Sequence, residues 1–151
     1  MSTSVSTVTH PDDVIAVEAL FHQWGYGDFS AGTLVEMMRF APNHLIMITE
    51  NDTQQPVAAL CYRQLEDEAE IIEIAVKQDK QRAGFGARLM QELIRRLITS
   101  NIQRLLLEVA ETNHKALSFY HHFGFQEIAR RHAYYQKTTD AIIMELRLSK
   151  V

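Results

Sequence analysis

The chain has 151 residues, is 46% hydrophobic and carries a formal net charge of −4, which suits one globular domain with its own core. The acidic balance argues against direct nucleic-acid binding, and the apolar runs, such as 45–48, are too short for a membrane-spanning helix. Residues 1–13 lack the basic start and the apolar run of a secretory signal.

The single cysteine, Cys61, cannot form a disulfide within the chain, and this favours a reducing, cytoplasmic location. As a lone thiol in a predicted strand, it is expected to pack as a small apolar group rather than to act as a nucleophile. No linker-like or repetitive segment divides the chain, so residues 1–151 are expected to form a single domain.

The first forty residues predict one strand and two helices. A short strand at 4–9 leads into a helix from Pro11 to Phe21, which opens with proline and two acids, as helices commonly do. Residues 23–30 place two glycines among aromatic side chains and predict a loop. A short helix over 31–40 ends before Pro42.

Three strands are predicted next, at 43–49, 57–65 and 70–76, with turns at 51–55 and 66–68. The second turn is acidic and is expected to be solvated, with attraction of a basic peptide as the alternative. The third strand runs directly into the segment on which the functional interpretation depends.

That segment, 81–87, reads Gln-Arg-Ala-Gly-Phe-Gly-Ala and lies between the strand and a helix with apolar residues at helical spacing. The first N–H groups of a helix have no partner within it, and glycine lets a phosphate approach them closely. The flanking charges sum to +3 and favour a small polyanion: Lys77, Lys80, Arg82 and Arg88 against Asp79.

Two other phosphate-binding loops do not fit this turn. The Walker pattern requires Gly-Lys-Ser/Thr, whereas Gly86 is followed by Ala87 and Arg88. The dinucleotide fingerprint requires three glycines, whereas the turn has only Gly84 and Gly86.

The second half of the chain predicts a parallel strand pair. Asn101 closes the helix, and residues 104–109 form a buried strand, which a right-handed crossover places beside the strand at 70–76. Asn113 is the predicted N-cap of a further helix, and Gly124 ends it. The final two strands, predicted to pair with each other, lie at 125–131 and 141–148.

The turn resembles the Gln/Arg-x-x-Gly-x-Gly/Ala pyrophosphate loop of the GCN5-related N-acetyltransferases, the GNAT family. Further matches follow in order at 74–76, 107–109, 113–120, 124–125, 134–135 and 141–144, and together they resemble the RimI-like subgroup. The resemblance covers 70–148 well and 1–65 poorly. It implies an α/β fold of mixed α+β type, with a twisted, mostly antiparallel sheet, splayed parallel strands four and five, and helices on both faces.

This resemblance implies direct transfer of an acetyl group from acetyl-coenzyme A to the N-terminal alanine of a small-subunit ribosomal protein. Acetyl-coenzyme A is the cosubstrate, and no metal is expected, because the histidines of 114–122 lack the spacing of a zinc helix. The partner is a basic protein N-terminal peptide rather than nucleic acid or membrane, and the enzyme is expected to be a monomer or weak dimer. The coenzyme-binding residues that it implies are Ile74, Ala75, Val76, Gln81, Arg82, Gly84, Gly86, Ala87 and Asn113.

The resemblance also assigns catalytic roles. Tyr120, two helical turns after Asn113, is the general acid for the leaving thiolate, and a strand-four N–H, that of Val76, stabilises the oxyanion. Glu108 interrupts an apolar run, where an unused carboxylate is costly, and is the expected general base. Glu73 interrupts the preceding strand in the same way and is the second candidate.

The acceptor pocket is expected to use aromatic residues from an early and a late loop, namely Trp24, Tyr26, Phe29, Tyr134 and Tyr135. The early loop departs from the subgroup, because Gln23-Trp24 stands where Pro-Trp is common. Two alternatives remain open. In the first, the enzyme acetylates a lysine side chain or a small-molecule amine. In the second, the chain is a non-catalytic module that binds acyl-coenzyme A.

Overall fold

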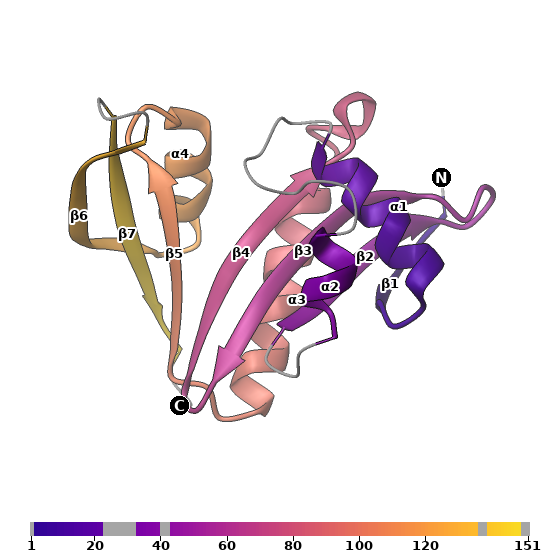
Figure 1. The fold of residues 1–151 in the computed structure, drawn as a ribbon, viewed down its shortest axis with the longest axis horizontal. Coiled ribbons are helices and arrows are strands. Elements are labelled where there is room, and N and C mark those ends of the chain that lie inside the picture. Colours follow the sequence, from indigo (N-terminus) through magenta and orange to yellow (C-terminus); the bar gives the residue numbers. More distant parts are fainter. Residues whose placement is uncertain (1, 23–32, 40–42, 136–138, 149–151) are drawn as a thin grey trace. The chain divides into compact units, whose positions relative to one another are not determined.

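The computed structural model describes residues 2–22, 33–39, 43–135 and 139–148 (Figure 1). In chain order the elements are β1 (Thr3–Thr7), α1 (Pro11–His22), α2 (Thr33–Met37), β2 (Asn43–Glu50), β3 (Pro56–Leu65), β4 (Glu68–Val76), the 3-10 turn η1 (Gln78–Lys80), α3 (Phe85–Thr99), β5 (Arg104–Ala110), α4 (His114–His122), β6 (Gln126–Tyr135) and β7 (Thr139–Arg147). The chain divides into two compact units, 1–64 with 72–96 and 65–71 with 97–151. Both β4 and α3 have residues in each unit.

Among the described residues the strand order is β1-β2-β3-β4-β5-β7-β6. β4 and β5 run parallel and pair over Glu68–Glu70, at the start of β4. The pairs β1–β2, β2–β3, β5–β7 and β6–β7 are antiparallel. This mixed sheet, with its parallel pair at the fourth and fifth strands, confirms the predicted fold class.

The core of the first unit lies on both faces of its strands. Alternate residues of β2 and β3, such as Leu45 and Cys61, pack with Phe21 of α1 and Leu34 of α2. The intervening residues, such as Ile46, are also fully buried, and α3 lies on this second side of the strands (Figure 1). Because both faces are covered, these strands read as continuous apolar runs rather than alternating ones.

A buried carboxylate positions α2. Glu18 of α1 is 7% exposed, and its Oε2 accepts the N–H of Leu34 at 2.7 Å, within the first turn of α2. An N–H group at a helix start is a favourable partner for a carboxylate and offsets the cost of burying it. The predicted helix over 31–40 is shorter than expected in the described residues, where it spans Thr33–Met37.

The second unit is organised around β7, which lies between β5 and β6. Its pairing with β6 confirms the prediction, and its pairing with β5 was not predicted. Arg104 of β5 joins three strands, because its guanidinium bonds Glu68 of β4 at 2.7 Å and Glu145 of β7 at 2.6 Å. Glu68 is therefore the first residue of β4 and forms an ion pair with Arg104, so its predicted place in a turn was wrong.

Local signals fixed the helix ends correctly. The Asn113 side chain accepts the N–H of Ala116 at 3.2 Å and caps α4, and Gly124 follows α4 with φ +95°. Asn101 adopts φ +63° after α3, a left-handed conformation that asparagine tolerates. No helix among the described residues is long and apolar enough to cross a membrane.

Candidate active site

The turn from β4 to α3 has an unusual backbone. After η1, Gln81 is extended (φ −67°, ψ 158°), Arg82 is left-handed (φ +64°) and Gly84 is left-handed (φ +84°). A left-handed arginine costs on the order of 1 kcal/mol, and such strain is concentrated at functional sites. The chain thus enters α3 through a contorted turn rather than a relaxed one.

Gly84 leaves open space beside the helix start. A Cβ at this position would meet nothing within 4 Å, so the glycine serves the backbone conformation and not tight packing. The first hydrogen bond of α3 runs from Arg88 N to Gly84 O at 3.0 Å, so the N–H groups of residues 85–87 precede the intrahelical ladder. Together with the positive end of the helix dipole, they form a favourable site for an anion.

Two of the flanking cations have partners within the protein. Arg88 donates from Nη1 to Thr3 Oγ1 at 2.7 Å and lies over the Phe85 ring, 5.9 Å from its centroid. Lys80 Nζ lies 3.8 Å from Glu50 Oε2. Lys77 and Arg82 are exposed, so they are better placed to meet a ligand from solvent.

Glu73 has an altered acidity on β4. Burial raises the pKa of its carboxyl to about 7, and the hydrogen bond from the Ile74 N–H, at 3.1 Å, opposes that rise. Cys61 is fully buried, and burial, with a further contribution from Glu73, raises the pKa of its thiol to about 12. The cysteine therefore packs as an apolar group, as predicted, while Glu73 is a carboxyl poised to change its charge near neutral pH.

Glu108 of β5 forms an ion pair that the sequence did not reveal. Its Oε1 lies 3.1 Å from Nη2 of Arg131 on β6, and its side chain is 25% exposed. Leu107 and Val109 on either side are buried, so Glu108 faces away from the apolar side of β5. This resolves the cost of a carboxylate within an apolar run, because the group is partly solvated and paired.

Tyr120 lies on the buried side of α4 and is 7% exposed. Its ring packs edge-to-face against Phe125 and Phe119, with centroids 5.5 Å away in both cases. Asn113 begins the same helix. The second unit therefore carries Glu108, Asn113 and Tyr120.

Residues predicted to bind the acceptor are only partly described. Tyr134 and Tyr135 are the last residues of β6, so their placement in a late loop was wrong. The strand is longer than predicted because β6 continues to pair with β7 as far as Tyr135 and Thr139. The early aromatic residues Trp24, Tyr26 and Phe29 lie outside the described residues.

The first unit brings together the predicted coenzyme-binding residues of β4 and the following turn, 74–76 and 81–87, with Glu73 among them. Arg131, the ion-pair partner of Glu108, is a residue that sequence reasoning missed. Its only signal was a second arginine in a predicted strand, which does not identify a partner. In the described part of the chain, no group of three or more histidine, cysteine or acidic residues is arranged to hold a metal ion.

The chain matches the family model described as "Acetyltransferase (GNAT) family" over residues 12–125. It is 43% identical over 86 residues to a ribosomal protein bS18-alanine N-acetyltransferase from Salmonella typhimurium, a match covering 55% of this chain and 58% of that protein. The Escherichia coli K12 protein of the same name is 42% identical over 86 residues, with the same coverage. The match therefore spans less than two thirds of these relatives.

Among solved structures, the fold is similar to that of the ribosomal-protein-S18-alanine N-acetyltransferase from Escherichia coli. The TM-score is 0.89 at 28% sequence identity, and the superposition covers 99% of this chain and 96% of that one. The superposition thus extends well beyond the 86 residues over which the sequence matches the Salmonella relative.

The raised pKa of Glu73 predicts a pH-dependent stability. The folded-state pKa, about 7, lies above the unfolded value, so the folded protein binds the extra proton and loses stability as the pH rises through 7. Glu73→Gln cannot ionise at this position. We therefore expect its free energy of unfolding, relative to that of the wild type, to be about 2 kcal/mol higher at pH 8 than at pH 5. Urea unfolding at both pH values measures this, and a difference independent of pH would contradict it.

Proposed function

The chain belongs to the acetyltransferase (GNAT) family, and on this basis we propose that it acetylates a protein N-terminal amine with acetyl-coenzyme A. The acceptor that we propose is the N-terminal alanine of a small-subunit ribosomal protein, and the names of the relatives, ribosomal protein bS18-alanine N-acetyltransferase, support this choice. The observation that carries this proposal is the turn at 81–87, where left-handed Gly84 leaves open space beside the first N–H groups of α3.

Acetyl-coenzyme A supplies the acetyl group as an activated thioester. We assign its pyrophosphate to the N–H groups of Gly86 and Ala87 and to the neighbouring Gln81, Arg82 and Gly84. The donor set fits, because it combines free space, a helix N-terminus and the exposed cation Arg82. The remaining contacts that we assign to the coenzyme are backbone groups of Ile74, Ala75 and Val76 and the side-chain amide of Asn113.

Asn113 has chemistry for both of its roles. Its Oδ1 accepts the N–H of Ala116, which stabilises the start of α4. A carboxamide also carries an NH₂ group with two donor hydrogens, and we assign these to the pantetheine arm of the coenzyme. Capping thus holds the amide in one orientation while leaving a donor for the ligand.

The transfer requires a proton to leave the attacking amine and a proton to reach the departing thiolate. We assign the second task to the Tyr120 hydroxyl, on a ring held by Phe119 and Phe125. We assign the first to Glu108, which is partly exposed and therefore accessible to water. A protein α-amino group has a pKa of about 8 and is already partly neutral near pH 7, so a weak base such as a carboxylate is sufficient.

Glu73 remains the second candidate base, and a specific observation favours it. A base is most effective when its pKa lies near the working pH, and burial brings the pKa of Glu73 to about 7. Glu108, in contrast, has one carboxylate oxygen, Oε1, in an ion pair with Arg131 Nη2 at 3.1 Å. The family resemblance favours Glu108, so the two glutamine variants must be compared directly.

The acceptor class is tested with matched peptides. We expect acetylation of a basic peptide that begins with alanine, and none of the same peptide when its N-terminus is blocked and only lysine amines remain. A lysine is neutral in only about one molecule per thousand at physiological pH and would need a stronger base. Mass spectrometry of the products reads the site directly, and acetylation confined to lysine would overturn the N-terminal assignment.

The coenzyme loop is tested with two glycine variants. Gly84→Ala strains a backbone at φ +84° and places a methyl group in the open space of the loop, so we expect at least about a tenfold loss of coenzyme A affinity. Gly124→Ala is the matched control, with φ +95° and a Cβ that would lie 3.4 Å from Leu146 Cδ1. It should lose stability but keep its affinity. Calorimetric titration and thermal unfolding measure both, and equal affinities would contradict the assignment.

Catalysis is tested by the rate of thiol release. We expect Tyr120→Phe and Glu108→Gln each to lower it by about a hundredfold, since each removes one proton transfer. Tyr62→Phe removes the hydroxyl of another buried tyrosine, 5% exposed, and should leave the rate unchanged. A loss in Glu73→Gln instead of Glu108→Gln would move the base to β4. Coenzyme binding without thiol release in the wild type would favour a non-catalytic binding module.

A further inference from the structure

The end of β6 carries an irregularity next to the residues proposed to bind the acceptor. The register changes from Arg131 opposite Ala141 to Tyr135 opposite Thr139, so β6 advances four residues while β7 advances two. Within this bulge Ala133 is left-handed, with φ +52°. Bulges bend a strand and re-aim its side chains, and they are frequent beside active sites. The direction of the backbone at Tyr134 and Tyr135 is therefore set by this bulge.

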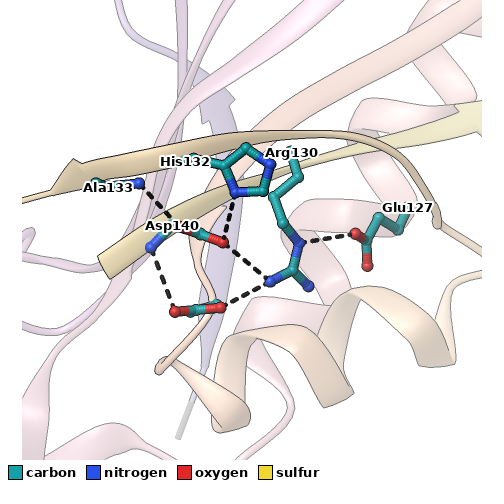
Figure 2. A network of polar contacts seen from close by, with 6 residues as sticks. Glu127, Arg130, His132, Ala133 and Asp140 are labelled. Atoms are coloured by element: carbon teal, nitrogen blue, oxygen red, sulfur yellow. Dashed lines mark hydrogen bonds and ion pairs between the residues drawn. The ribbon is translucent and has the colours of Figure 1, made fainter. Parts of the chain in front are cut away.

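Asp140, on β7, holds the bulge from the opposite strand (Figure 2). Its Oδ1 accepts the Ala133 N–H at 2.8 Å, while its Oδ2 lies 3.3 Å from Arg130 Nη1 and 3.3 Å from His132 Nδ1. The hydrogen bond from the Ala133 N–H is the largest of the effects that lower the pKa of Asp140, and the hydrogen bond from Arg130 lowers it further. One carboxylate thus contacts the side chains of Arg130 and His132 and the backbone amide of Ala133.

The same network ties the bulge to the end of β5. Asp140 N donates to Glu111 Oε1 at 3.3 Å, and Glu111 N donates to Asp140 O at 3.0 Å. Arg130 Nη1 also bonds Glu111 Oε2 at 2.7 Å. Glu111 directly follows β5 and lies two residues before Asn113, the cap of α4. The bulge is therefore anchored to the segment that begins α4.

Without Asp140 this conformation would be unfavourable. A left-handed alanine is disfavoured relative to extended backbone, because its Cβ comes close to the following carbonyl oxygen, and no glycine relieves this crowding here. The short charge-assisted bond to the Ala133 N–H is of the strength needed to offset that cost. Removing the acceptor would let the end of β6 relax toward a regular strand.

We propose that Asp140 is a positioning residue for acetyl transfer, which fixes the acceptor-binding end of β6 by holding the Ala133 bulge. The inference rests on the proposed function, because the acceptor role of Tyr134 and Tyr135 is part of it. Asp140 acts through the backbone of these residues and does not itself meet the reacting groups.

The test compares Asp140→Ala with Asp140→Asn. Alanine removes the acceptor for the Ala133 N–H, whereas asparagine retains a carbonyl oxygen for it and loses the charge and the second acceptor oxygen, which faces Arg130 and His132. We expect Asp140→Ala to raise KM for an alanine-starting peptide about tenfold, with KM for acetyl-coenzyme A unchanged. Asp140→Asn should stay within about threefold of the wild type. Glu127→Gln is the matched control, since Glu127 bonds Arg130 at Nε, 3.3 Å away, from the outer side of the network.

Amide hydrogen exchange at Ala133 gives a readout that does not depend on activity. Exchange should quicken in Asp140→Ala and stay slow in Asp140→Asn and Glu127→Gln. Fast exchange with an unchanged peptide KM would overturn the positioning role, as would an equal rise in both substrates' KM. A wild type that acetylates no amine while its Ala133 amide is protected would overturn the proposed function and, with it, the acceptor role of Asp140.

Discussion

The proposed binding of the coenzyme depends on the N–H groups in the first turn of α3, because these groups have no hydrogen-bond acceptor within their own helix. The first intrahelical bond begins at Arg88, so the preceding N–H groups need partners outside the helix, and a bound anion can be one of them. Their direction is fixed by apolar packing, because Leu89 and Leu93 of α3 are fully buried. Ala75, near the end of β4, belongs to the core that β2 and β3 form with α1 and α2. A polar function is thereby held in place by two hydrophobic layers.

The features that the sequence predicted well are those decided within a few residues. Asn113 caps α4 and Gly124 ends it, because cap and terminal glycine respond to the adjacent backbone only. The glycine turn after β4 was predicted for the same reason, and the left-handed φ of Gly84 agrees with it. The parallel pairing of β4 and β5 followed from the strand-helix-strand order, which permits few connections.

The features that the sequence left undetermined depend on register between distant strands. Glu108 meets Arg131, and Arg104 meets both Glu68 and Glu145, across separations that no local pattern encodes. A shift of one residue in register would send each side chain to the opposite face. The extension of β6 through Tyr135 was missed for a related reason, since a bulge breaks the alternation by which a strand is recognised.

The seclusion of Cys61 has a practical consequence for anyone working with this protein. It is the only cysteine in the chain, it is fully buried, and its thiol has a pKa of about 12, so the folded protein offers no reactive sulfhydryl. A chromogenic thiol reagent would therefore report coenzyme turnover without background from the catalyst. In denaturant the same reagent would report the rate at which the hydrophobic core opens, since its reaction with Cys61 requires the core to unfold at least locally.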